Sequence, residues 1–123
     1  MDNENTKFIV DSPLGYTVSC SEDTWNKHIM AGHPIMENNE QTVKDAITNP
    51  ISVYKSSANP HRHVYFGDTE NASYNVAYTK VIVGNVGADE SHVTITAFPA
   101  KKMDGNIDGG ELLYVSDKPR FSK

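Results

Sequence analysis

The apolar residues of this chain change their spacing at Asn49-Pro50, and this change limits the folds that the chain can form. Before the break, apolar positions recur with a helical period. This predicts one helix from about Glu22 to Ala31 and another from about Glu40 to Thr48. After the break, apolar and polar residues alternate, as they do in strands with one buried face. We therefore expect helices first and an antiparallel sheet after them.

The first predicted helix carries signals at both of its ends. Ser19 followed by Glu22 matches a capping box, and Ser21 is an alternative N-cap. Gly32 is a natural stop after the last helical turn, and Pro34 prevents the helix from continuing. The second predicted helix ends at the Asn-Pro pair that also marks the change of period.

The segments after Pro50 predict five strands, at about 51–55, 63–67, 74–83, 92–98 and 111–115. Alternation places every second residue from Val76 to Ile82 on one face of its strand. The same alternation in the next strand places four residues on one face: His92, Thr94, Thr96 and Phe98. Two shorter apolar segments, 7–10 and 16–19, flank a turn and are able to form a hairpin.

Together these elements predict a single α+β domain over residues 1–123, with N-terminal helices packed on an antiparallel β-sheet. Residues 1–6 are polar and are expected to form a disordered lead. The only cysteine, Cys20, allows no internal disulfide and fits a reducing compartment. The acidic N-terminus is unlike a signal peptide, and no apolar run reaches the length of a membrane span. We expect a cytoplasmic protein with no membrane partner.

The net charge of -5 counts against nucleic-acid binding through bulk electrostatics, although a local basic cleft remains compatible with it. The cationic residues gather in the second half of the chain, as Lys80, Lys101, Lys102, Lys118, Arg120 and Lys123. Of these, Lys101 and Lys102 are either a solvated pair or a phosphate contact at the mouth of a cleft.

Four of the five histidines lie in two short segments. His28 and His33 stand at the end of the first predicted helix, and His61 and His63 flank Arg62 on a predicted turn. Histidine exchanges protons near neutral pH, and a guanidinium can hold a phosphate through two hydrogen bonds. These residue types suit acid–base chemistry on a phosphodiester without a cofactor.

Each of these histidines also has a structural interpretation. The helical period places His28 on the inner face with Trp25 and Ile29, where it is either a core histidine or a functional one. His33 follows Gly32 at a helix end, where it either does chemistry or complements the helix dipole. His61 and His63 either belong to a solvated turn or, with a helix histidine, form a three-histidine zinc site.

The order of motifs resembles a known family. The helix motif W-x-x-H-I-x-x-x-H-P covers Trp25 to Pro34, an N-P pair leads into a strand, and a later strand ends in T-x-T-A-F at Phe98. The chain from about Val18 to Phe98 resembles the barnase/EndoU/colicin/RelE-like (BECR) nuclease fold, in its phage-associated and polymorphic-toxin branches. The resemblance implies a metal-independent endoribonuclease in which the ribose 2′-oxygen attacks the neighbouring phosphate.

By this resemblance, four residues of this chain correspond to functional positions of the family: His28, His33, Arg62, and Thr94 or Thr96. We expect His33 to act as general base, His28 or His63 to protonate the leaving oxygen, and Arg62 and Thr96 to steady the phosphate. The expected substrate-binding residues are Thr94, Tyr78, Lys80 and Lys101.

The expected partners are RNA and a cognate immunity or antitoxin protein, with no cofactor and no bound metal. Two alternatives stay open at this point. One is a catalytically inactive phage or mobile-element binding protein of the same fold, which the acidic charge favours. The other is a metal-dependent hydrolase that uses His61, His63 and a helix histidine.

Overall fold

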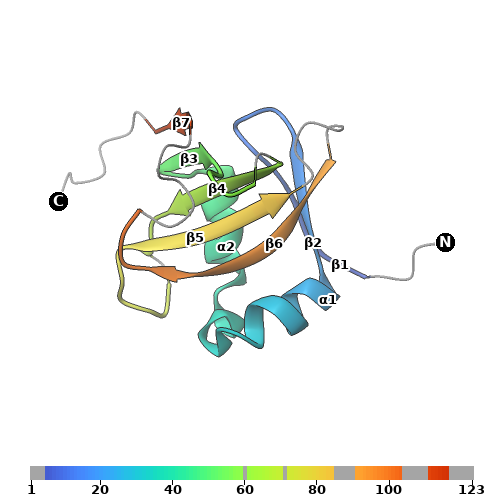
Figure 1. The fold of residues 1–123 in the computed structure, drawn as a ribbon. Coiled ribbons are helices and arrows are strands. Elements are labelled where there is room, and N and C mark those ends of the chain that lie inside the picture. Colours follow the sequence, from blue (N-terminus) through green and yellow to red (C-terminus); the bar gives the residue numbers. More distant parts are fainter. Residues whose placement is uncertain (1–4, 60, 71, 85–90, 104–110, 117–123) are drawn as a thin grey trace.

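The computed structural model describes residues 5–59, 61–70, 72–84, 91–103 and 111–116. Within them, seven strands form one sheet in the order β1-β2-β6-β5-β4-β3-β7 (Figure 1). All neighbouring strands are antiparallel except β2 and β6, which pair in parallel over three residues. The strands are β1 Thr6–Asp11, β2 Thr17–Ser21, β3 Ser52–Lys55, β4 Arg62–Gly67, β5 Tyr78–Gly84, β6 Ser91–Ala100 and β7 Leu112–Val115.

The α+β class is confirmed, but the prediction that the helices are N-terminal is wrong. The β1–β2 hairpin precedes them and joins the sheet through the parallel contact between β2 and β6. Its apolar residues Phe8, Val18 and Cys20 are buried in the core, which is why the hairpin belongs to the sheet. The lead expected to be disordered overlaps β1 at Thr6, and residues 1–4 lie outside the described part of the chain.

The second predicted helix is confirmed as α2, Glu40–Thr48. The first is a single turn, α1 Glu22–Thr24, that continues as the π-helix η1, Trp25–Met30. Ser21 is its N-cap, because its side-chain oxygen accepts a hydrogen bond from the backbone N–H of Thr24 at 3.0 Å. Ser19, the other candidate cap, lies within β2. A 3-10 helix, η2 Pro34–Asn38, connects η1 to α2 and was not predicted.

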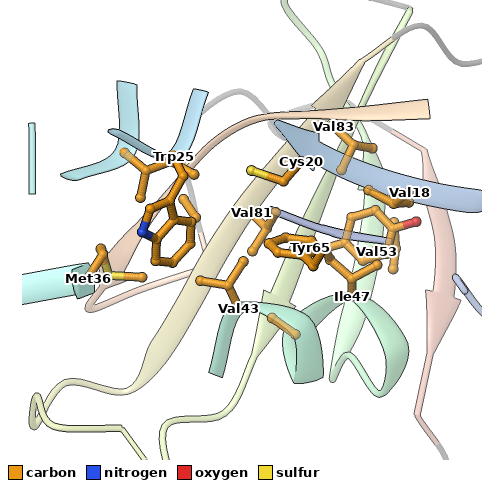
Figure 2. Packing of buried hydrophobic residues seen from close by; sticks show 14 residues of the cluster. Val18, Cys20, Trp25, Met36, Val43, Ile47, Val53, Tyr65, Val81 and Val83 are labelled. Carbon is orange, nitrogen blue, oxygen red and sulfur yellow. The ribbon is translucent and has the colours of Figure 1, made fainter. Parts of the chain in front are cut away.

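The core lies between the helices and one face of the sheet, which we call the helix-covered face (Figure 2). Val43, Ala46 and Ile47 supply the buried stripe of α2. Across from them, Tyr65 of β4 and Val81 of β5 are fully buried. Alternation along the strands then sends the next residues to the other side of the sheet, where Val64 and Phe66 form a second buried cluster with Tyr54, Tyr78, Ile82 and Met103.

Gly67 sets how closely α2 approaches the sheet. A Cβ atom built on Gly67 would lie 2.5 Å from the Cβ and 2.6 Å from the Cα of Ala46, so no side chain fits there without moving the helix. We expect Gly67→Ala to lower the free energy of unfolding by about 1–3 kcal/mol, the usual cost of overpacking. Chemical denaturation measures it. Gly32→Ala is the matched control, since the nearest atom there is the carbonyl oxygen of His28 at 3.6 Å. Equal destabilisation by both variants would contradict this explanation.

An irregularity in β6 changes which side its residues face. Thr94 pairs with Val83 and Thr96 pairs with Ile82, so one extra residue of β6 stands between two successive residues of β5. Such a bulge reverses the alternation of the strand. The prediction that His92, Thr94, Thr96 and Phe98 share one face is therefore wrong. The first two lie on the helix-covered face, and the last two lie on the other side.

Candidate functional site

The side of the sheet away from α2, which we call the second face, carries a lysine between two aromatic rings. Phe66, Lys80 and Phe98 are cross-strand partners on β4, β5 and β6. The Nζ atom of Lys80 lies 5.8 Å from the ring centroid of Phe66 and 5.6 Å from that of Phe98, which are cation–π distances. Lys80 is only 6% exposed. Its charge therefore lies in a poorly hydrated environment, where electrostatic effects are strong.

His33 joins this row from the helical layer. Its backbone N–H donates to the carbonyl of Ile29 at 2.9 Å, and Pro34 begins the next helix, so the residue is held between two rigid elements. The imidazole stacks on Phe98 with the ring centroids 5.1 Å apart and the planes at 29°. Phe98 thus contacts both the imidazole of His33 and the ammonium of Lys80, so the two residues adjoin the same ring.

Thr96 and Arg62 lie farther along the same face. Thr96 precedes Phe98 by two residues on β6 and is half-buried. Arg62 is exposed and pairs with Gly84, and its Cγ atom lies 3.9 Å from the position that a Gly84 Cβ would take. Gly84 is four residues from Lys80 along β5, a distance of about 13 Å at the usual rise of a strand. Arg62 and Lys80 therefore start from backbone positions at different ends of the second face.

Two more of the predicted substrate-binding residues, Tyr78 and Lys101, lie in different parts of the structure. Tyr78 is half-buried on the second face, with its ring edge-on to Phe66 at 6.1 Å. Lys101 is exposed in the bend that follows β6. Three of the late cationic residues, Lys118, Arg120 and Lys123, lie outside the described residues.

His28 and Thr94 lie together, but away from this row. His28 is exposed, whereas Trp25 and Ile29 are buried, so the prediction that all three share the inner face is wrong. The π-helical turn turns His28 out of the buried stripe. With Thr94 it lines a cavity of about 400 Å³ between β2, η1 and β6. The full lining is Asn5, Thr6, Ser19, Cys20, Ser21, Thr24, His28, Val93, Thr94 and Ile95.

His63 lies on the helix-covered face, whereas its neighbour Arg62 lies on the second face. His63 belongs to a chain of hydrogen bonds that was not predicted from the sequence. Its Nδ1 is 2.6 Å from the hydroxyl of Tyr16. That hydroxyl is 2.6 Å from the hydroxyl of Tyr65, which is 2.6 Å from the Oγ of Ser12. The chain joins the β1–β2 turn to β4 through the core.

The directions of these hydrogen bonds fit a neutral His63. Burial lowers its pKa to about 4, helped by the neighbouring His92 and Lys55. Burial raises the pKa values of the Tyr16 and Tyr65 hydroxyls, so both keep their protons. The neutral ring can then accept from Tyr16 at Nδ1, while Tyr16 accepts from Tyr65. Protonating His63 would make Nδ1 a donor, so the Tyr16 hydroxyl could no longer donate to it.

Stability should therefore fall in acid because of His63. Its folded pKa is below the ordinary value of about 6.5, so stability is complete above pH ~6.5 and is lost as the pH falls toward ~4. The loss is at most about 3 kcal/mol, and less because the ring is partly exposed. We expect His63→Gln to flatten the dependence of the free energy of unfolding on pH in this window. The exposed His61, changed to Gln, is the control. An unchanged slope in His63→Gln would contradict the assignment.

Of this cluster only His63 was among the predicted site residues; Ser12, Tyr16, Tyr65 and His92 were not. The rings of Tyr16 and His92 stack with centroids 3.7 Å apart and planes at 16°, and His92 is 3% exposed. The available signal was the i, i+2 spacing of His63 and Tyr65, which places both on one strand face. Tyr16 could not be added from the sequence, because its place depends on how the hairpin docks on the sheet.

The next two observations concern a metal site and a membrane span, and both refer to the described residues. Among its residues, no group of three or more histidine, cysteine, aspartate or glutamate side chains is arranged to hold a metal ion. His61 is exposed, and its backbone N–H donates to the Oδ1 of Asn59 at 2.9 Å. None of the described helices is long and apolar enough to cross a membrane.

Comparison with known proteins adds no assignment. No family model, no curated protein and no solved structure matches this chain.

Proposed function

We propose that this protein is a metal-independent endoribonuclease and that the second face of its sheet is the active surface. The observation that supports this most strongly is the pair formed on Phe98, where the imidazole of His33 and the ammonium of Lys80 contact one ring. Thr96 and Arg62 lie on the same face. A proton acceptor, a poorly hydrated cation, and hydroxyl and guanidinium donors are groups that can promote phosphodiester cleavage.

His33 is the proposed general base. The imidazole takes the proton of the ribose 2′-hydroxyl, the 2′-oxygen forms a bond to the adjacent phosphorus, and the bond from phosphorus to the 5′-oxygen breaks. The products are a 2′,3′-cyclic phosphate and a new 5′-hydroxyl. Phe98 acts as a positioning residue, because its ring fixes the plane of the imidazole.

Lys80 is the proposed source of positive charge at the reacting phosphate and of the proton for the leaving 5′-oxygen. Its burial between two rings makes the ammonium more effective there than an exposed lysine would be. This differs from our sequence-based expectation, in which His28 or His63 supplied that proton. Neither histidine has a role in this proposal. His28 lies at the cavity between β2 and β6, and His63 lies on the helix-covered face.

Arg62 and Thr96 have secondary roles in this proposal. We assign Arg62 to a neighbouring phosphate, because its cross-strand partner Gly84 lies four residues along β5 from Lys80. Thr96 would add a hydroxyl donor between Arg62 and the His33 end. Because the net charge is -5, RNA binding in this proposal depends on a few placed cations and not on a broad basic surface. The order of sequence motifs that resembles BECR nucleases supports the same reaction class.

The test is cleavage of single-stranded RNA by the purified chain in EDTA. Cleavage with cyclic phosphate ends supports the proposal. Intact RNA favours the inactive binding protein, and cleavage that EDTA abolishes favours a metal-dependent hydrolase.

A further inference from the structure

The cavity between β2, η1 and β6 is built where two parallel strands separate. β2 and β6 pair only from Thr17 with Ser91 to Ser19 with Val93, and beyond this point they diverge. Beyond the paired residues, β6 continues into its bulge and β2 leads into α1. The space left between them encloses about 400 Å³.

The lining is about equally polar and apolar, and among the residues that the structure describes it contains no acidic, lysine or arginine side chain. Hydroxyls come from Ser19, Ser21 and Thr24, and His28 presents an exposed imidazole. Burial, helped by the nearby Glu40 carboxylate, raises the pKa of the Cys20 thiol to about 12, so it stays neutral. Such a lining does not suit a phosphate or a metal ion. It suits a neutral ligand that has hydrogen-bonding groups at its edge.

Thr94 supplies the cavity with a hydroxyl that has no hydrogen-bond partner among the described residues. The residue itself is 2% exposed. A buried hydroxyl without a partner costs stability, and a ligand that hydrogen-bonds to it would offset that cost. Beside it, Val93 is 38% exposed and offers an apolar surface at the same cavity.

The cavity also adjoins the second face through Ile95. Ile95 lines the cavity, and its Cδ1 lies 3.0 Å from the position of a Gly84 Cβ, beside the stem of Arg62. From there β6 continues to Thr96 and Phe98. A nucleic-acid strand held along β6 would thus reach the cavity at one end and His33 at the other.

We propose that this cavity binds one nucleobase of the RNA strand. A base is neutral and flat, with hydrogen-bonding edges and apolar faces. These properties match the hydroxyls, the imidazole and the two aliphatic side chains at the cavity. The inference rests on the proposed function for its biological ligand, but base binding is measurable without cleavage.

The experiment titrates the wild-type chain with free uridine, cytidine, adenosine and guanosine and follows the NMR signals of the His28 ring. We expect saturable shifts with at least one nucleoside and none with ribose 5-phosphate. Thr94→Val keeps the shape of the side chain and removes its hydroxyl. We expect it to weaken binding about tenfold while raising the melting temperature, because an unpartnered hydroxyl is lost.

Thr79→Val is the matched control. Thr79 is also fully buried in a strand, but its hydroxyl contacts Tyr74 and donates to the carbonyl of Asp68 at 3.4 Å. It should lose stability and keep nucleoside affinity. No saturable shift with any nucleoside, or equal shifts with ribose 5-phosphate, overturns the inference even if RNA is cleaved. Nucleoside binding that persists in His33→Ala while cleavage is lost supports both proposals separately.

Discussion

Replacing His33 with alanine is expected to lower the rate of RNA cleavage by about a hundredfold or more. This is the usual contribution of a general base. The variant removes the imidazole that stacks on Phe98 at 5.1 Å, and it leaves the half-buried backbone position between η1 and η2 unchanged. Initial rates on a short single-stranded RNA in EDTA measure the effect, and a thermal melt of each protein excludes unfolding as its cause.

His61→Ala is the matched control for this experiment. His61 is an exposed histidine on the turn before β4, and the proposal gives it no role. Its variant should cleave at the wild-type rate. If His33→Ala keeps more than half of the wild-type rate, or if both variants lose activity equally, His33 is not the base.

Replacing Lys80 with methionine should cost a similar factor, about a hundredfold to a thousandfold in rate, as losing one donor to a developing charge does. Methionine keeps an unbranched apolar side chain between Phe66 and Phe98 and removes the ammonium. A thermal melt of the variant, recorded beside its rate, separates a loss of chemistry from a loss of stability.

Two other cationic residues calibrate the Lys80 result. Lys101→Met removes an exposed ammonium after β6 and should change the rate less than threefold. Arg62→Ala should weaken RNA binding with a smaller loss of rate, since its cross-strand partner Gly84 lies about 13 Å from Lys80 along β5. If Arg62→Ala lost more of the cleavage rate than Lys80→Met, the reacting phosphate would bind at the Arg62 end of the second face and not beside Lys80.

The elements whose position depends on local pattern alone were predictable from the sequence. The stripe of Val43, Ala46 and Ile47, ended by Asn49-Pro50, gave α2 its observed bounds, Glu40–Thr48. Alternation likewise placed Tyr78, Lys80 and Ile82 on one face of β5, and all three lie on the second face. In both cases the period of the apolar residues decides which side is buried. The predicted start of that strand at residue 74 is wrong, because β5 begins at Tyr78 and Val76 lies in a bend before it.

The misplaced residues mark where tertiary packing overrides that period. A π-helical turn exposes His28, and the bulge in β6 separates Thr94 from Thr96. Neither has a signal in the local sequence, because both depend on how the helical layer and the neighbouring strand fit together. The parallel contact of β2 with β6 joins segments more than seventy positions apart, and no local pattern specifies such a pairing.

The central proposal is 2′-oxygen attack promoted on the second face, and one substrate comparison tests it most directly. The wild-type chain is incubated in EDTA with a DNA strand that contains a single ribonucleotide and with the same strand carrying 2′-O-methyl at that position. We predict cleavage only after the free ribose, with a 2′,3′-cyclic phosphate end, and its loss in His33→Ala. Cleavage of the 2′-O-methyl strand, or equal cleavage by His33→Ala, would contradict the proposed chemistry.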